Sequence, residues 1–279
     1  MTLIEFALLV FAGSLAAGLL GALTGLGGGV VIVPLLTPVL GVDIRYAIVA
    51  SLIAVIATSS GAAAAYVKEG FTNIRIGMFL EIATTTGAIA GAYLAGFLSP
   101  SLIAVIFGLV LVYSSFLSLK GKHDEPHPDD RPDPLATRLN LDGSFPTSKG
   151  ARSYHVHSIP TGFSLMALAG VLSGLLGIGS GAVKVLAMDQ AMRIPFKVST
   201  TTSNFMIGVT AAASAGIYLN RGYIDPAIAM PVVLGVLVGS MTGARILVKA
   251  HPKHLRMVFA IVIFVLAAEM IFNGITGRI

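Results

Sequence analysis

The sequence contains a glycine-rich stretch, Gly25-Leu26-Gly27-Gly28-Gly29-Val30-Val31-Ile32-Val33, and a second stretch 152 residues later, Gly177-Ile178-Gly179-Ser180-Gly181-Ala182-Val183-Lys184-Val185. Each copy lies inside a long apolar run, so each is expected to interrupt a membrane helix. Interrupted membrane helices at matching places in two halves of a chain are the best pointer that a sequence gives to a transport site. We call residues 25–29 the first break and residues 177–181 the second break.

The composition is that of a membrane protein. Hydrophobic residues make up 55% of the chain, mean hydropathy is +0.89, and charged residues make up 11%, against about 25% in an ordinary soluble domain. Apolar runs of about 20 residues have the length that a bilayer requires, which disfavours the alternative of a very apolar soluble α/β domain. We therefore expect an all-α, polytopic protein of the inner (plasma) membrane, with about 8–10 transmembrane helices.

The cysteine count and the charge exclude several classes. The chain has no cysteine, which excludes disulfides, thiol catalysis and cysteine-ligated metals. The net charge of +5 is not a signal for nucleic acid, because the basic residues lie in loops between apolar runs, where they set orientation. The N-terminus lacks a basic region before its first apolar run, so we expect that run to remain as a spanning helix.

The apolar runs divide the chain into a first repeat at 1–119, a polar linker loop at 120–158, and a second repeat at 159–279. Prolines and charges in the linker, as in His123–Pro134, favour an extended or mobile segment outside the bilayer. The runs lie at about 3–24, 27–40, 46–67, 76–98 and 101–119, and again at about 159–176, 179–192, 199–219, 226–248 and 256–276.

The two halves align without a gap at the same spacing. Ser51 falls on Ser203, Thr58 on Thr210, Tyr66 on Tyr218, Gly70 on Gly222, Gly87 on Gly239 and Phe107 on Phe259. The constant register across three helices predicts a duplication.

The basic residues favour an inverted duplication. If each half has five crossing elements, Arg45, Arg221 and Arg278 fall on one side, and the other loop residues from Lys68 to Arg256 fall on the opposite side. Four crossings per half give a smaller asymmetry, and the positive-inside rule favours the larger one. We therefore expect both termini outside and the linker in the cytoplasm. The post-glycine runs 27–40 and 179–192 are only about 21 Å of helix, so they are either short crossings or half-helices that enter and return.

The breaks are candidate binding sites for an anion. Glycines expose backbone N–H groups, and the following half-helix directs its positive end at the break. We expect Gly27, Gly28 and Gly29, with Gly179, Ser180 and Gly181, to bind substrate oxygens. The alternative is close packing of helices through small residues.

Hydroxyl-rich helices follow both breaks. The second repeat contains Ser199-Thr200-Thr201-Thr202-Ser203-Asn204, of which Thr202, Ser203 and Asn204 are expected substrate ligands. Ser51 and Thr58 are the expected ligands of the first repeat, and Thr210 matches Thr58. The alternative is that these hydroxyls bond to the backbone of their own helices.

Few charged residues lie inside the apolar runs, and intramembrane charges are usually functional. Lys184, five residues after Gly179, is a candidate ligand for a substrate anion, with pairing to Asp189 as its alternative. Arg245 is expected to reach the cytoplasmic surface. Glu81 and Asp189 are candidates for proton coupling. Asp189 has a second alternative, an ion pair with Arg193.

Other chemistry is not indicated. The first break lacks the strand and the later acidic residue of a dinucleotide fold, and the chain contains no P-loop. We see no catalytic triad and no metal cluster; His155 and His157 are expected to be solvated. We expect no enzymatic activity, no cofactor and no bound metal.

The first break with its continuation to Pro34, Ala50-Ser51 in the next helix, and Lys68-Glu69-Gly70 before the following one resemble the sulfite exporter TauE/SafE family, also called the toluene-sulfonate uptake permease group. The second break with Thr201-Thr202-Ser203 is similar to that family's weaker second motif. The resemblance covers nearly the whole chain apart from residues 120–158.

This resemblance implies a secondary transporter, most simply an exporter, of small organosulfur anions such as sulfite or sulfonates, moved by alternating access. The alternatives are a transporter of other small carboxylate anions, a channel, or a membrane-embedded assembly protein. The expected partners are the anion and the lipid bilayer, and a homodimer is kept open. Two features depart from the family: Pro34 is matched by Leu186, and the linker is long. The family is often described as four-helix units, whereas the charges here favour five elements.

Overall fold

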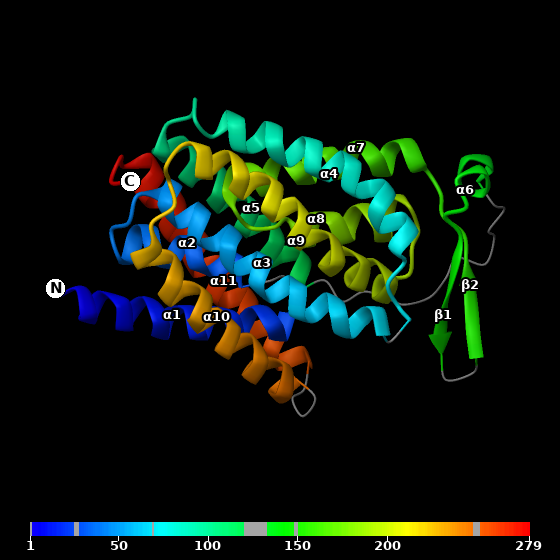
Figure 1. Ribbon diagram of the computed structural model, residues 1–279, viewed down its shortest axis with the longest axis horizontal. Coiled ribbons are helices and arrows are strands. Elements are labelled where there is room, and N and C mark those ends of the chain that lie inside the picture. The colour runs from blue at the N-terminus through cyan, green and yellow to red at the C-terminus, as the bar shows by residue number, and fades with distance from the viewer. Residues whose placement is uncertain (1, 25–27, 69, 120–132, 148–149, 248–251) are drawn as a thin grey trace.

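A computed structural model describes residues 2–24, 28–68, 70–119, 133–147, 150–247 and 252–279. Long helices run roughly side by side, and a small unit with a β-hairpin lies at one end of them (Figure 1). The first half contains α1 (Leu3–Thr24), α2 (Gly29–Pro34), the π-helical turn η1 (Leu35–Val39), α3 (Ile44–Lys68), α4 (Ile74–Leu94) and α5 (Pro100–Leu119).

The same order of elements returns in the second half. It contains α7 (Ile159–Leu176), α8 (Gly181–Leu186), the π-helical turn η2 (Ala187–Ala191), α9 (Phe196–Asn220), α10 (Pro226–Leu247) and α11 (Pro252–Ile275).

The starts of these elements repeat the 152-residue spacing of the sequence. Gly29 and Gly181 begin α2 and α8, each of 6 residues, and the π-helical turns that follow have 5 residues each. The equal lengths show that Pro34, which Leu186 replaces, does not make the two segments different. Each segment is about 16 Å long at helical rise, so each is a half-helix and not a full-length crossing.

Local sequence signals explain where several helices begin and end. Proline is the first residue of α5, α10 and α11, a position where its missing N–H group costs nothing. The Asn73 side chain accepts a hydrogen bond from Ile76 N and caps α4. Gly177 ends α7 with φ 72°, a left-handed conformation that glycine adopts without strain.

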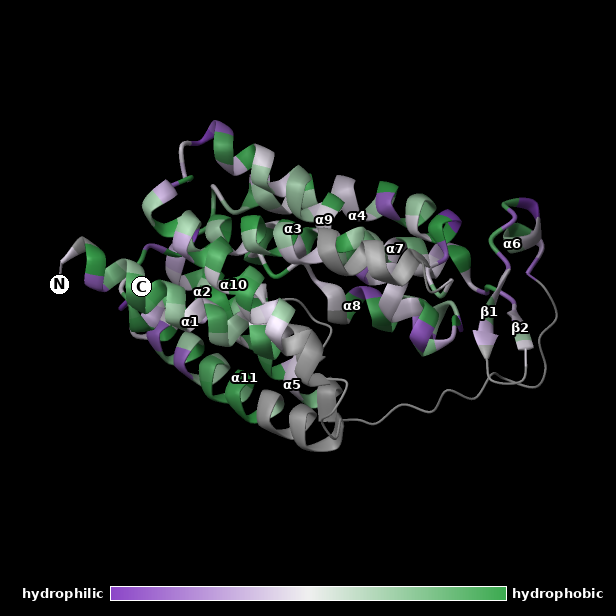
Figure 2. Cartoon of the chain, turned by 60° about the horizontal axis from the view of Figure 1, so that its bottom comes forward, coloured by the Kyte–Doolittle hydropathy of each residue, from purple (hydrophilic) through white to green (hydrophobic). Residues whose placement is uncertain are grey.

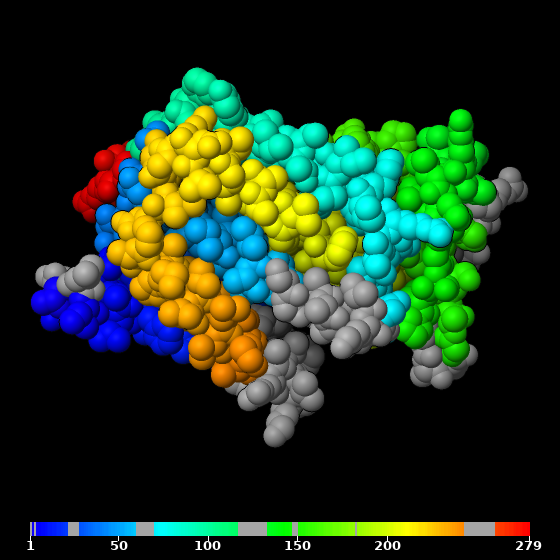
Figure 3. Space-filling model, viewed as in Figure 1, coloured from blue at the N-terminus to red at the C-terminus, as the bar shows by residue number. Residues whose placement is uncertain are grey.

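Helices of one half pack mainly on helices of the other. α1 lies along α10, and α4 lies along α7, while α3 packs on α9 and α5 on α11. Small residues allow this approach: a Cβ at Gly87 of α4 would overlap the Ala167 carbonyl oxygen of α7, and a Cβ at Gly239 of α10 would overlap the Leu15 carbonyl oxygen of α1. On the face shown in Figure 3, α3 and α9 lie between α4 and α10.

Both chain ends lie at one end of the helices, and the hairpin unit lies at the other (Figure 1). Arg45 and Arg221 lie at the same end as the termini, where α4 ends (Figure 1). The guanidinium group of Arg45 donates to the Leu98 carbonyl oxygen, just after α4, and that of Arg221 donates to the carbonyl oxygens of Ala92 and Tyr93, in the last turn of α4. Each half therefore brings the chain from one end of the molecule to the other.

The outer surface suits a lipid environment. Hydrophobic residues cover the long helices and hydrophilic residues gather mainly at their ends and in α6 (Pro134–Arg138) (Figure 2). Large apolar side chains such as Ile82, Met241 and Phe264 are more than half exposed. Among the described residues, the windows Ile4–Gly21 and Ile159–Leu176 are long and apolar enough to cross a membrane by length and composition. Shorter apolar stretches lie in α3, α5, α10 and α11 and in the segment formed by α2 and η1.

The linker differs from its predicted form. Residues 120–132 and 148–149 lie outside the described residues, but the described part of 133–158 is folded, which corrects the expectation of an extended or mobile segment there. The chain as a whole is mostly helical, as the sequence predicts. α6 is followed by β1 (Gly143–Thr147) and β2 (Gly150–Tyr154), which pair antiparallel with Gly143 opposite Tyr154. We call α6 and these two strands, with the residues that join them to α7, the hairpin unit. Leu141, Tyr154 and Val156 are buried in one apolar cluster with Ile76 and Leu80 of α4, so burial against the helices explains why this charged segment folds.

Candidate functional site

The two breaks meet in the interior of the molecule. Ser51 Oγ of α3 lies 2.7 Å from the Gly177 carbonyl oxygen and 3.0 Å from the Gly29 carbonyl oxygen, so its hydroxyl joins residues of both breaks. Ser203 of α9, the matching residue, donates to the Gly181 carbonyl oxygen at 3.3 Å. Ser51 and Ser203, which the sequence predicts as substrate ligands, therefore lie against the backbone of the breaks, and their contact with a substrate stays a prediction.

The described glycines of the breaks are closely packed. A Cβ at Gly29 would lie 2.6 Å from both Ser51 Oγ and a methyl carbon of Val55, and a Cβ at Gly179 would lie 2.9 Å from Ile207. Gly28 and Gly181 are buried as well, and Gly27 lies outside the described residues. These contacts are what the packing alternative requires; contact between an anion and this backbone stays a prediction.

The second break also holds a buried charge. Lys184 of α8 is 0% exposed, and its Nζ donates to Thr210 Oγ1 of α9 at 2.6 Å. Thr210 Oγ1 in turn lies 2.6 Å from Glu81 Oε1 of α4. A threonine hydroxyl can accept from the ammonium and donate to the carboxylate at the same time, so it links the two opposite charges.

Two further threonines of α4 lie beside Glu81 and Thr210. Thr85 Oγ1 donates to Glu81 Oε1 at 3.0 Å, and Thr84 Oγ1 lies 3.5 Å from Thr210 Oγ1. Glu81 Oε2 is buried and has no hydrogen-bond partner among the described residues. We call Glu81, Lys184 and Thr210, with Thr84 and Thr85, the charged cluster.

The structure therefore brings Lys184 and Glu81 together, which the sequence singled out separately as a substrate ligand and a proton-coupling residue. It also gives Lys184 a hydrogen bond to Thr210. Thr84 and Thr85 were missed, although three consecutive threonines beginning three residues after Glu81 in an apolar helix are a visible signal.

The other predicted residues lie outside the charged cluster. Thr58 Oγ1 bonds to the carbonyl oxygens of Ala54 and Val55 in its own helix, which is the alternative for that residue. Thr202 Oγ1 accepts from Asn73 N. Asn204 is 8% exposed, Ser180 Oγ is buried without a hydrogen-bond partner among the described residues, and Asp189 lies in η2.

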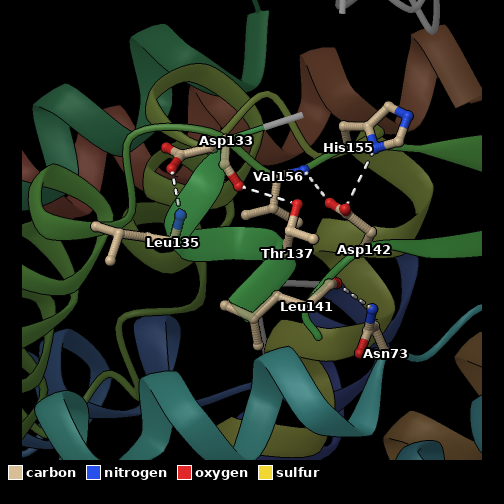
Figure 4. Close-up of polar contacts among 8 residues, drawn as sticks. All are labelled: Asn73, Asp133, Leu135, Thr137, Leu141, Asp142, His155 and Val156. Carbon is tan, nitrogen blue, oxygen red and sulfur yellow. Dashed lines mark hydrogen bonds and ion pairs between the residues drawn. The ribbon is translucent and has the colours of Figure 1, made fainter. Parts of the chain in front are cut away.

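The hairpin unit is held to the start of α4 by polar contacts of Asn73. Asn73 Nδ2 donates to the Leu141 carbonyl oxygen at 3.3 Å (Figure 4). It also donates to Tyr154 Oη at 2.7 Å. Burial raises the pKa of the Tyr154 phenol above its ordinary value of 10.0. The unit therefore anchors the N-terminus of the helix that carries Glu81.

His155 belongs to this anchored unit. Its Nδ1 lies 3.3 Å from Asp142 Oδ2, and Asp142 Oδ1 accepts from Val156 N (Figure 4). His155 was expected to be solvated, and the structure gives it a carboxylate partner. No group of three His, Cys, Asp or Glu residues comes together as a metal site in the described part of the chain.

Comparison with known sequences decides the family. The profile of the family described as "Sulfite exporter TauE/SafE" matches residues 10–270. This chain belongs to the TauE/SafE family. The match spans both breaks, the charged cluster and the hairpin unit, and it establishes the chain as a member of a family of membrane transporters.

Curated relatives of this TauE/SafE protein carry the same general description. YunE of Bacillus subtilis (strain 168), a probable membrane transporter protein, is 30% identical over 279 residues, covering 97% of this chain and 99% of the relative. A probable membrane transporter protein of Xylella fastidiosa (strain 9a5c) is 26% identical, covering 98% of each chain. MJ0441 of Methanocaldococcus jannaschii, also a probable membrane transporter protein, is 26% identical and covers 91% of each. No solved structure gives a significant match.

Proposed function

We propose that this protein is a secondary transporter that moves small organosulfur anions, such as sulfite or sulfonates, across the inner membrane by alternating access. The observation that carries the proposal is the Lys184 ammonium, fully buried where the second half is interrupted. A buried charge inside a membrane protein is costly and is usually kept for a pathway or a ligand. The family description supplies the chemical class, a sulfur oxyanion.

The architecture supports alternating access. The matched bounds of the elements and the reciprocal packing of α1 on α10 and α4 on α7 are what an inverted repeat of five elements per half would give. The two repeats would rock about the centre where the breaks meet. In this arrangement the termini lie outside, and the linker, with most of the basic loop residues, lies in the cytoplasm.

The residue roles follow from position. Backbone N–H groups of the two breaks, with Ser51, Thr58, Ser203 and Asn204, bind anion oxygens as the substrate passes. Lys184 supplies the positive charge. Glu81 and Asp189 take up and release protons. Export is the direction that the family description supports.

Counter-flow in proteoliposomes tests this function. Vesicles preloaded with sulfite, sulfoacetate, taurine, thiosulfate or simple carboxylates are diluted into labelled sulfite, and transient accumulation of label is expected with the sulfur oxyanions. Counter-flow with carboxylates alone would show that the substrates are carboxylates and not sulfur oxyanions. Linear flux that shows neither saturation nor counter-flow would indicate a channel, and no flux with any anion would favour a structural role.

A further inference from the structure

The charged cluster has hydrogen-bonding capacity beyond its internal bonds. An ammonium has three donors, and Thr210 is the hydrogen-bond partner that the described residues give Lys184 Nζ. Glu81 accepts on Oε1 from Thr210 and Thr85, while Oε2 is buried with no hydrogen-bond partner among those residues. Buried polar groups are normally satisfied, so these groups are arranged for more than a static ion pair.

The charge balance of the cluster limits what it can bind. With Lys184 protonated and Glu81 ionised, the pair is neutral overall. An added monoanion would leave one uncompensated negative charge at a buried site, which is costly. Protonation of Glu81 removes that charge, and then the Lys184 ammonium faces the anion alone.

We propose that Glu81 and the transported anion compete for the Lys184 ammonium, so that one anion binds together with one proton. This inference rests on the proposed transport function. The proton comes from solvent and goes to Glu81; its preferred site is Oε2, because Oε1 accepts the two threonine hydroxyls. Thr210, which links Lys184 to the carboxylate, transmits the exchange from α4 to α8 through α9.

No other titratable group described on the packed elements faces Glu81. α4 packs on α7 and α9, and α7 contains no titratable side chain. On α9, Lys197 lies over the Phe71 ring, and Tyr218 donates to the Gly174 carbonyl oxygen. On α4, Arg75 donates to the Asn140 carbonyl oxygen of the hairpin unit, and Tyr93 stacks with Arg221. The proton that accompanies the anion is therefore assigned to Glu81 opposite Lys184.

Competition for one cation has a direct consequence for transport. An anion that binds only when Glu81 is protonated travels with that proton, so a monovalent anion moves without net charge. Obligatory exchange of an anion for a proton would require the opposite linkage, in which the anion displaces the proton. The geometry of the charged cluster favours movement of the anion and the proton together, in the same direction.

The test uses purified full-length protein and methanesulfonate, whose charge does not change with pH, so that any proton uptake belongs to the protein. Binding is measured by calorimetry from about pH 5 to about pH 8 in buffers of different ionisation enthalpy. We expect uptake of about one proton per anion and about a tenfold loss of affinity per pH unit.

Three variants separate the roles. Glu81→Gln, a permanently neutral mimic of the protonated side chain, is expected to bind methanesulfonate with no proton uptake and no pH dependence. Lys184→Met combined with Glu81→Gln removes both charges, avoids an unpaired buried carboxylate, and is expected to lose at least tenfold in affinity relative to Glu81→Gln alone. Glu269→Gln in α11, an acidic residue in another apolar run, is the matched control and is expected to behave as the unchanged protein.

The outcomes distinguish the inference from the function. Binding without proton uptake, or a pH dependence that persists in Glu81→Gln, overturns the competition but leaves anion transport standing. If Glu81→Gln and the double variant bind methanesulfonate with equal affinity, Lys184 does not bind the anion. If the unchanged protein binds none of methanesulfonate, sulfite or acetate, the proposed function fails and the competition fails with it.

Discussion

The two breaks are followed by helical segments of the same length, but one break has apolar surroundings and a pair of opposite charges lies beside the other. In the first half, the residue that matches Lys184 is Ile32, which is also 0% exposed. The residue that matches Glu81 is Val233. Thr58, which matches Thr210, bonds to carbonyl oxygens of its own helix, and the described residues give it no other partner. The first break is therefore an apolar copy of a structure that carries a charge pair in the second.

This difference separates features that both halves share, which build the helix packing, from the charged side chains found at one break. Matched helix lengths and small-residue crossings occur in both halves, so they serve the scaffold. The ammonium of Lys184 and the carboxylate of Glu81 come from different halves but meet at the second break and have no counterparts at the first break, which fits the recognition and coupling proposed for them. In the proposed transport cycle, the matched helices of the two halves would supply two related packings, and Lys184 would supply a single cation for the anion.

The largest effect is expected when the charge is copied to the apolar side. Ile32→Lys puts an ammonium at a fully buried position that lacks a carboxylate at the matching place. A buried unpaired charge costs several kcal/mol, and about 4 kcal/mol is expected here. Thermal unfolding of the purified variant in detergent should show a large drop in midpoint or a loss of folded protein.

A compensating change makes this test informative. Ile32→Lys together with Val233→Glu recreates, at the first break, the pair that Lys184 and Glu81 form at the second break, and about half of the lost stability should return. Ile32→Met, which keeps the size and adds no charge, is the control. Failure of Val233→Glu to recover any stability would show that α3 and α10 do not place positions 58 and 233 as α9 and α4 place Thr210 and Glu81.

The helix crossings should respond alike in both halves. A Cβ at Gly87 or at Gly239 would overlap a carbonyl oxygen of α7 or α1, so Gly87→Ala and Gly239→Ala should each destabilise by about 2 kcal/mol through overpacking. Gly216→Ala in α9 has open space around the new methyl group and should be neutral or stabilising by about 0.5 kcal/mol. Equal midpoints for all three variants in thermal unfolding would contradict this packing.

The sequence was sufficient for the scaffold because its signals are local or repeated. Glycine spacing, apolar runs and the register at 152 residues located the helices to within a few residues, and the loop arginines placed Arg45 and Arg221 at one end. The contact between Glu81 and Lys184 could not be derived, because it depends on how α4 and α8 lie against α9. The folded hairpin unit was missed since its buried Leu141, Tyr154 and Val156 are scattered among prolines and charges.

Matched serines offer a smaller test of the comparison. Ser51 contacts two carbonyl oxygens, whereas Ser203 contacts that of Gly181 at the longer distance of 3.3 Å. Ser51→Ala should therefore cost about 1.5 kcal/mol and Ser203→Ala about 0.5 kcal/mol. Thermal unfolding of the two variants measures the difference, and a larger cost for Ser203→Ala would show that the second break depends more on its serine.

An effect smaller than that of Ser51→Ala is expected at the caps of the matched helices α4 and α10. Asn73 caps α4 and also binds Tyr154, whereas Asp225, its counterpart, caps α10 through Ala227 N. Tyr154→Phe removes the phenol that Asn73 contacts and should cost about 1 kcal/mol. Hydrogen exchange of residues 143–154 is the measurement, and faster exchange there with unchanged exchange in α10 is expected.

The pH dependence of hydrogen exchange in the hairpin tests whether the neutral Tyr154 phenol holds the hairpin to α4. Since burial raises the pKa of Tyr154 in the folded unit above 10.0, its stabilising contribution is complete below pH 10.0 and is lost as pH rises through the raised value. Exchange in the hairpin should therefore accelerate above about pH 10 in the unchanged protein. The same acceleration in Tyr154→Phe would assign it to another group, whereas its absence there would show that ionisation of this phenol releases the hairpin from α4.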